Sequence, residues 1–196
     1  MGGTASKPCL PVGRRDAASA AGELMATRPK PQPVEELYTM TTTIVTPDQD
    51  AVVSEIQISA PPERVFKALT DAGELKHWFG GPDCPVKFWQ FDARVGGRYS
   101  YETGRGSIVV NGVNEFKCHG EILEYDPPRV LVYTWIGNWH DDTSKGTVVR
   151  WELTPKSEGT HVRVTHSGLS TLPVAREDYS QGWPGVVEML KKFVEK

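Results

Sequence analysis

The sequence predicts an α+β domain in which a curved antiparallel sheet of about seven strands wraps around a long C-terminal helix. Three observations predict this class. Strand-like apolar patterns recur after residue 51, the connections between them are too short for crossover helices, and the last segment switches to a helical period. Because that last helix is the only predicted element long enough to cover the sheet, it should bury the sheet's apolar face.

The first fifty residues differ in composition from the rest of the 196-residue chain. Of the 18 aromatic residues (six each of Trp, Tyr and Phe), only Tyr38 lies there, together with six of the 15 prolines. Such a segment cannot bury enough apolar surface to offset the entropy cost of ordering it. We therefore expect residues 1–50 to be a disordered or mis-started N-terminal extension and residues 51–196 to form one folded domain.

Charge and hydropathy exclude several classes of protein. A formal net charge of −3 argues against sequence-independent binding of nucleic acid, which needs a basic surface. No stretch approaches the roughly 18 apolar residues that a membrane span requires, and none forms the apolar core of a signal peptide. We expect a cytoplasmic protein without a membrane span.

The folded part begins with a strand and two short helices. Apolar and polar residues alternate over 52–58, as in a strand with one buried face. A helix should begin at Pro62, because proline is tolerated in a first turn, and end near Thr70. Asp71 and Glu74 have the spacing of a capping box at the start of a second helix.

Six further strands and a terminal helix complete the prediction. The strands are β-branched and aromatic runs between turn residues, at about 86–92, 97–103, 116–125, 130–136, 147–154 and 161–165. The helix has apolar residues at i, i+3, i+4 and i+7, namely Trp183, Val186, Val187, Leu190, and then Phe193 and Val194.

Short motifs occur along this order of elements. They are APPERVFKALTD at 60–71, Glu74-Leu75 with Trp78, FDARVGG at 91–97, GEI at 120–122, RVLVYTW at 129–135, THSGL at 165–169 and GW at 182–183. Together they resemble the SRPBCC (START-like) superfamily, whose plan is the helix-grip fold. Within it, the chain is most similar to proteins homologous to the C-terminal domain of the activator of the ninety-kilodalton heat-shock chaperone's ATPase.

The resemblance spans about residues 52–196 and implies a small cytoplasmic SRPBCC/START-like ligand-binding domain with a cavity between sheet and terminal helix. The leading hypothesis is a non-catalytic domain that binds a small hydrophobic or aromatic molecule, with a role in a stress response. Two alternatives stay open. One is an enzyme like the polyketide cyclases and aromatases, and the other is a co-chaperone module that binds a chaperone.

Strand parity selects the candidate ligand contacts, because alternate side chains point to opposite faces of a sheet. The apolar parity and the helices supply ten of them: Phe66, Trp78, Tyr99, Tyr101, Tyr133, Trp135, Trp151, His166, Trp183 and Met189. They could line an aromatic pocket. The alternative is that the same rings simply fill the core.

The opposite parity carries Arg98 with Glu102 and Arg150 with Glu152, which we expect to form ion pairs on a solvated face. If the sheet's curl turned Arg98 or Arg150 inward, the guanidinium would anchor a carboxylate ligand. In the enzyme alternative His119, His166, Glu102 or an arginine would move protons.

The histidines do not have the spacing of a metal site. His161 and His166 face opposite sides of one strand, and His140 with Asp141 and Asp142 forms a loop cluster without further spaced ligands. We predict no catalytic residues, no metal site and no cofactor.

Overall fold

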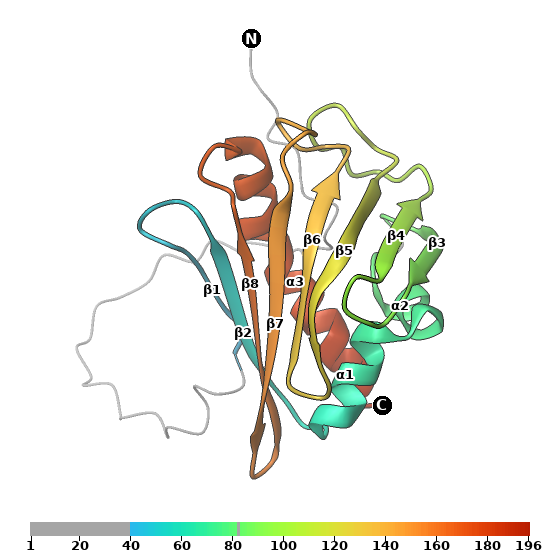
Figure 1. The fold of residues 1–196 in the computed structure, drawn as a ribbon, viewed down its shortest axis with the longest axis vertical. Helices are drawn as coiled ribbons and strands as arrows, with labels where there is room; N and C mark the ends of the chain where they lie inside the picture. Colours follow the sequence, from blue (N-terminus) through green and yellow to red (C-terminus); the bar gives the residue numbers. More distant parts are fainter. Residues whose placement is uncertain (1–39, 82) are drawn as a thin grey trace, which may run out of the picture.

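The computed structural model describes residues 40–81 and 83–196, and its elements form one eight-stranded antiparallel sheet with three helices (Figure 1). The strand order is β1-β2-β8-β7-β6-β5-β4-β3. In chain order the elements are β1 (Thr42–Val45), β2 (Val52–Ile58), α1 (Pro62–Thr70), α2 (Ala72–Trp78), β3 (Val86–Phe91), β4 (Arg98–Thr103), β5 (Lys117–Asp126), β6 (Val130–Gly137), β7 (Thr147–Lys156), β8 (Gly159–Ser167) and α3 (Pro173–Val194).

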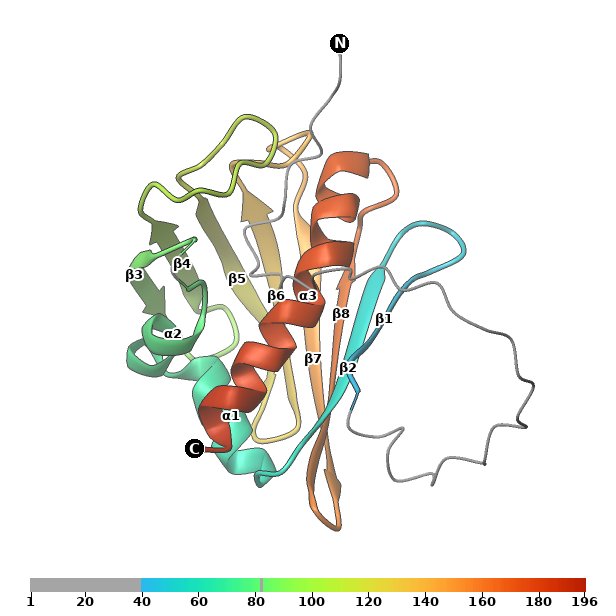
Figure 2. The ribbon, with the colours of Figure 1, turned by 180° about the vertical axis from the view of Figure 1, so that it is seen from behind.

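α3 lies diagonally across one face of the sheet, and α1 and α2 lie on the same side (Figure 2). The side chains that the sequence assigns to the inner face are buried between the two layers. They include Tyr99 and Tyr101 on β4, Leu131, Tyr133 and Trp135 on β6, and Val149, Trp151 and Leu153 on β7. The predicted fold class, a sheet wrapped on a C-terminal helix, is therefore confirmed.

The sheet has one strand more than the sequence predicts. β1 pairs with β2 in antiparallel register, from Thr42 opposite Glu55 to Val45 opposite Val52. This edge strand is short and only half-buried, so it has no clear apolar period. It lies before the expected domain start at residue 51, so the sheet begins earlier than predicted. Of the proposed N-terminal extension, residues 1–39 lie outside the described residues.

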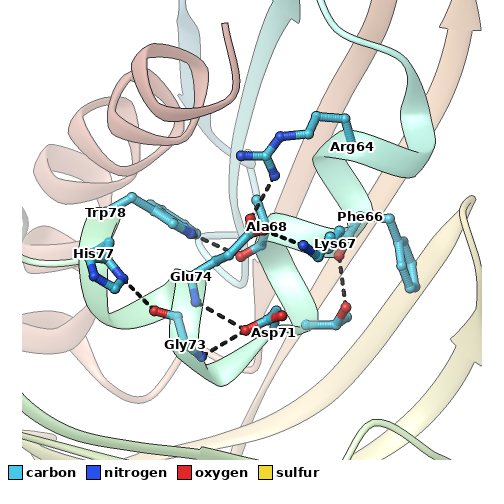
Figure 3. Close-up of polar contacts among 10 residues, drawn as sticks. Arg64, Phe66, Lys67, Ala68, Asp71, Gly73, Glu74, His77 and Trp78 are labelled. Carbon is cyan, nitrogen blue, oxygen red and sulfur yellow. Dashed lines mark hydrogen bonds and ion pairs between the residues drawn. The ribbon is translucent and has the colours of Figure 1, made fainter. Parts of the chain in front are cut away.

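The α1–α2 corner forms as the sequence indicates, with one difference (Figure 3). The Asp71 carboxylate accepts hydrogen bonds from the backbone N–H groups of Gly73 (2.8 Å) and Glu74 (3.1 Å), and so caps α2. Glu74 does not return to Asp71. It instead forms ion pairs with Arg64 (2.6 Å) and Lys67 (2.9 Å) of α1. The capping residue thus sets the start of α2, while Glu74 ties the two helices together.

Across residues 40–81 and 83–196, no helix combines the length and the apolar character needed to cross a membrane.

Candidate ligand-binding site

Nine of the ten candidate residues are buried, and Met189 is half-buried. The structure gathers most of them around the Trp135 ring on β6. Ring centroids within 6.4 Å of it belong to Tyr99, Tyr101, Tyr133, His166 and Trp183 among the candidates. Trp151 joins this group through Trp183, at 5.5 Å. Seven of the ten predicted contacts therefore form one aromatic cluster between sheet and α3.

Phe66 and Trp78 lie away from that cluster, at the α1–α2 corner. The Phe66 ring contacts Tyr125 at 5.5 Å, and the Trp78 ring contacts Phe79 at 5.6 Å. The Trp78 indole N–H donates to the Ala68 carbonyl at 2.9 Å (Figure 3). These two residues hold the corner to the core, and their role as ligand contacts stays a prediction.

The polar atoms of the aromatic cluster mostly bind one another. The Trp151 indole N–H donates to the Tyr133 hydroxyl at 2.9 Å, and the Trp135 N–H donates to the Tyr179 hydroxyl at 2.8 Å. The Tyr99 hydroxyl donates to the Thr134 carbonyl at 2.7 Å. Such bonds fix ring orientations, because breaking one leaves a buried polar atom without a partner.

His166 points inward, as its parity predicts, and both ring nitrogens are occupied. The Trp183 indole N–H donates to Nδ1 at 3.2 Å, so Nδ1 carries a lone pair and Nε2 carries the proton. Nε2–H then donates to the Thr147 hydroxyl at 2.7 Å, which in turn donates to the Trp135 carbonyl at 2.8 Å. Burial, with a smaller contribution from His140, lowers the pKa of His166 well below its usual value. His166 is therefore a neutral, fully bonded core histidine.

A buried polar group that the sequence did not indicate lies at the N-terminal half of α3. The Trp139 indole N–H donates to Asp178 Oδ2 at 3.1 Å, and His140 Nε2 lies 2.6 Å from the Tyr179 hydroxyl. All four residues are buried. The sequence indicates these residues only weakly, because Trp139 and His140 lie in a loop, where apolar residues do not recur at a regular spacing. Asp178 and Tyr179 would be predicted as buried only if the apolar face of the helix were extended from Trp183 toward the helix N-terminus.

Asp141 ties the loop of residues 138–146 to α3, and Asn111 ties the same loop to the β4–β5 connection. Asp141 accepts hydrogen bonds from the backbone N–H groups of Val174 (3.1 Å) and Ala175 (3.0 Å), and so caps α3 from outside the helix. The Asn111 amide donates to the carbonyls of Trp139 (3.2 Å) and His140 (3.3 Å). This side of the interior is thus built from three separate chain segments.

A hollow of about 400 Å³ opens where these segments meet. Its lining residues are Val110 and Asn111 from the β4–β5 connection and Pro173, Val174, Glu177, Asp178 and Gln181 from α3. None of the ten candidate residues lines it. The volume lies within the range of about 300–1,000 Å³ that is typical of small-molecule sites.

Asp178 is the unusual group in this hollow. Asp178 is only 6% exposed, and its Oδ1 has no hydrogen-bond partner within the described residues. Burial raises the pKa of this carboxyl to about 7, although the bond from Trp139 acts in the opposite direction. Asp178 therefore titrates near neutral pH, and its Oδ1 is a buried oxygen without a partner among the described residues.

The charged residues of the opposite parity lie on the outer face of the sheet. Arg98, Glu102 and His119 are exposed. The expected pair of Arg150 with Glu152 forms at 3.3 Å, but the expected pair of Arg98 with Glu102 does not, because Glu102 instead pairs with Lys117 at 3.6 Å. The inward turn of an arginine that the sequence left open does not occur. His119 and Glu102, which the enzyme alternative placed in the pocket, face away from α3. Within the described part of the chain, no group of three or more His, Cys, Asp or Glu residues could hold a metal ion.

A curved antiparallel sheet that holds a long terminal helix, with two short helices between β2 and β3, defines the helix-grip class (Figure 2). Comparison with known families then identifies the family. The family described as "Activator of Hsp90 ATPase homolog 1-like protein" matches residues 59–195, which is more than half of the chain. The chain belongs to this family, and the resemblance to the SRPBCC superfamily is confirmed.

Solved structures support the same assignment. A protein from Mesorhizobium loti is 30% identical, with a TM-score of 0.56 over 74% of this chain and 96% of its own. A protein from Chromobacterium violaceum is 28% identical, with a TM-score of 0.62 over 75% of this chain and 99% of its own. An AHSA1-like protein from Aeromonas hydrophila, 21% identical, shares the fold with a TM-score of 0.58 over 74% and 92%. None of the curated proteins compared matches the chain.

Proposed function

We propose that this domain binds a small molecule with a hydrophobic or aromatic body and an amine or hydroxyl head group, in the hollow beside α3. The observation that carries the proposal is the buried Asp178 carboxyl, which borders a site-sized hollow and whose Oδ1 has no partner among the described residues. An unpartnered buried polar group costs about 1–3 kcal/mol, which a donor on a ligand would recover.

The walls of the hollow favour the same chemistry. Val110, Pro173 and Val174 offer apolar surface, and Glu177 adds a second carboxylate beside Asp178. Among the residues that the structure describes, no lysine, arginine or histidine lines the hollow. A head group that is positively charged or donates hydrogen bonds should therefore be preferred over a carboxylate.

We propose that the ligand body reaches inward from the hollow to the aromatic cluster around Trp135. Tyr179 hydrogen-bonds Trp135, and it follows Asp178 directly in α3. A ligand body that passes Asp178 would meet these rings, and the ten candidate residues are the contacts we propose for it. A bound ligand of this size would require some of the rings to move.

Matched probes test the proposal. Isothermal titration with 3-phenylpropan-1-amine, 3-phenylpropan-1-ol and 3-phenylpropanoate should show the amine binding at least about tenfold more tightly than the acid at pH 8. Asp178→Asn should remove that preference, whereas the exposed Glu158→Gln, in the β7–β8 turn, should leave it unchanged. Equal affinity for amine and acid would contradict the proposal. Native mass spectrometry would show any ligand that copurifies.

A second candidate function is proton transfer on an aromatic ketone-like substrate, as in the cyclase alternative. The pKa of about 7 for Asp178 favours it, because a general base works best when its pKa is near the operating pH. Deuterium exchange into the methyl group of acetophenone, followed by NMR, should be faster with the wild-type protein than with Asp178→Asn. Identical rates would leave only the binding function.

The co-chaperone alternative rests on the description of the family rather than on the site. It predicts that the purified chain changes the ATPase rate of the ninety-kilodalton chaperone. An unchanged rate, together with a pull-down that recovers no chaperone, would remove it.

We also propose a cytoplasmic location and a role in a stress response, as the superfamily resemblance implies. Cell fractionation would test the first. Comparison of protein abundance before and after heat shock would test the second.

A further inference from the structure

A second hollow, of about 520 Å³, lies on the face of the sheet opposite α3. Its walls come from three neighbouring strands, β4, β5 and β6, together with Gln90 of β3. Side chains of outward parity surround it: Arg98, Ser100, His119, Glu121, Thr134 and Ile136. It is separate from the hollow at Asp178, with which it shares no residue.

The hollow lies over an interruption of the sheet. Between the pairs His119–Ile136 and Ile122–Tyr133, β5 and β6 have no paired residues. The Glu121 N–H donates to the Thr134 side-chain hydroxyl at 2.9 Å, and the Thr134 carbonyl accepts the Tyr99 hydroxyl at 2.7 Å. Side chains thus form hydrogen bonds with the Glu121 N–H and the Thr134 carbonyl, two backbone groups that would bond each other in a regular antiparallel ladder.

Gly120 is the residue that permits this arrangement. A Cβ atom at this position would lie 1.9 Å from the Thr134 oxygen and 2.7 Å from Cε1 of Tyr99. Because glycine has no such atom, the Tyr99 ring can lie across the strand. Tyr99 belongs to the inner aromatic cluster and is also one of the residues that line the outer hollow, so this strand position contributes to both faces of the sheet.

The charges at this hollow differ from the other charges on the outer face. Two other arginines on this face are paired: Arg150 with Glu124 at 2.6 Å, and Arg163 with Glu55 at 3.3 Å. Arg98 and Glu121 are opposite each other on β4 and β5, yet no ion pair or side-chain hydrogen bond joins either of them to another described residue. One unpaired cation and one unpaired anion therefore border the same hollow.

We propose that this hollow binds a free α-amino acid, or a similar small zwitterion, with an apolar side chain. The carboxylate would lie on the Arg98 guanidinium, which offers a planar pair of donors. The ammonium group would lie on Glu121, and the apolar side chain would lie along Ile136. A zwitterion satisfies both unpaired charges at once, which a simple acid or a simple amine does not.

Amide NMR spectra of the full chain test this site with leucine, 4-methylpentanoate and 3-methylbutan-1-amine as probes. Leucine should shift the signals of His119, Gly120 and Glu121 and should bind more tightly than either singly charged probe. Arg98→Gln and Glu121→Gln should each weaken leucine binding about tenfold or more. Arg163→Gln and Glu55→Gln, which change a pair on the same face away from the hollow, should have no effect.

The singly charged probes separate the two contacts. Binding of 4-methylpentanoate should depend on Arg98 and not on Glu121, and binding of the amine should show the reverse. The proposal is overturned if leucine at about 20 mM moves none of the three signals, a concentration that would detect even millimolar affinity. It is also overturned if all four variants weaken binding equally, or if the acid alone binds as tightly as leucine.

Discussion

The two halves of α3 meet the rest of the molecule in different ways. In the C-terminal half, Val186, Val187 and Leu190 are fully buried, and the helix contacts β2 and α1. In the N-terminal half, Asp178 and Tyr179 are buried with a histidine and a tryptophan from the loop after β6. One half is an apolar core that stabilises the fold. The other buries polar groups at a cost in stability, which is the pattern expected of a binding site.

The largest effect should come from breaking the apolar half. Leu190→Ala removes a fully buried side chain and should lower the free energy of unfolding by about 2–5 kcal/mol, measured by urea denaturation. Val174→Ala, on the exposed side of the same helix, should change it by less than about 0.5 kcal/mol. If the two variants were equally stable, α3 would not be packed as described.

Asp178→Asn tests the polar half of α3, because it should change how the free energy of unfolding depends on pH. The carboxyl has a pKa of about 7 in the folded protein against its ordinary value of 3.8, so folding favours the protonated form. The stability that protonation contributes is complete below about pH 4 and is lost as the pH rises through 7. By linkage the loss approaches about 4 kcal/mol.

The measurement is urea denaturation of both proteins at pH 4.5, 6 and 8. The wild type should lose stability relative to Asp178→Asn between pH 4.5 and 8, and the difference should level off above that. A difference that does not change with pH would mean that Asp178 is solvated and that the polar half of α3 is open. Because both proteins keep His140 and His166, titration of those residues cancels in the comparison.

Tyr179→Phe should have a smaller effect. It removes the hydroxyl that accepts from Trp135 and lies against His140, leaving two buried nitrogens without a partner. The expected total loss is about 1–3 kcal/mol, the cost of leaving buried polar groups unsatisfied, measured by thermal and urea unfolding. The control is Tyr125→Phe, a half-buried tyrosine at the other end of the sheet. If this control lost as much stability, the loss in Tyr179→Phe could not be assigned to the buried hydrogen bonds.

Asp141→Ala should have the smallest effect of the four. It removes the carboxylate that caps α3 through Val174 and Ala175, at an expected cost of about 1 kcal/mol. Hydrogen exchange should become faster at those two amides and stay unchanged at Leu190. Equal protection in both proteins would show that the loop does not hold the helix end.

Much of the fold could be predicted because local patterns carry it. The alternation from Val53, the proline at the start of α1 and the Asp71 cap each specify an element from a few neighbouring residues. β1 was missed because a four-residue edge strand of exposed and half-buried residues has no such pattern. Its position depends on pairing with β2 rather than on its own side chains.

The candidate site could be predicted only in part. Parity correctly placed the aromatic candidates on the inner face, and the ring contacts around Trp135 follow from that placement. Parity could not indicate Asp178, because an aspartate on a helix is expected to be exposed. Whether the predicted rings contact a ligand stays a prediction.

The sequence by itself determined the order of the elements from β2 onward and the face that each of them buries, since periodicity requires only the spacing of apolar residues along the chain. Only the tertiary structure decided that Asp178 is buried against Trp139, and that Tyr99 reaches the Thr134 carbonyl across the bare backbone of Gly120. These contacts join residues far apart in the chain. The physical reason is that the free energy of burying a polar atom, and its ability to bind a ligand, depend on which partners lie next to it in the folded chain. No local sequence pattern encodes those partners.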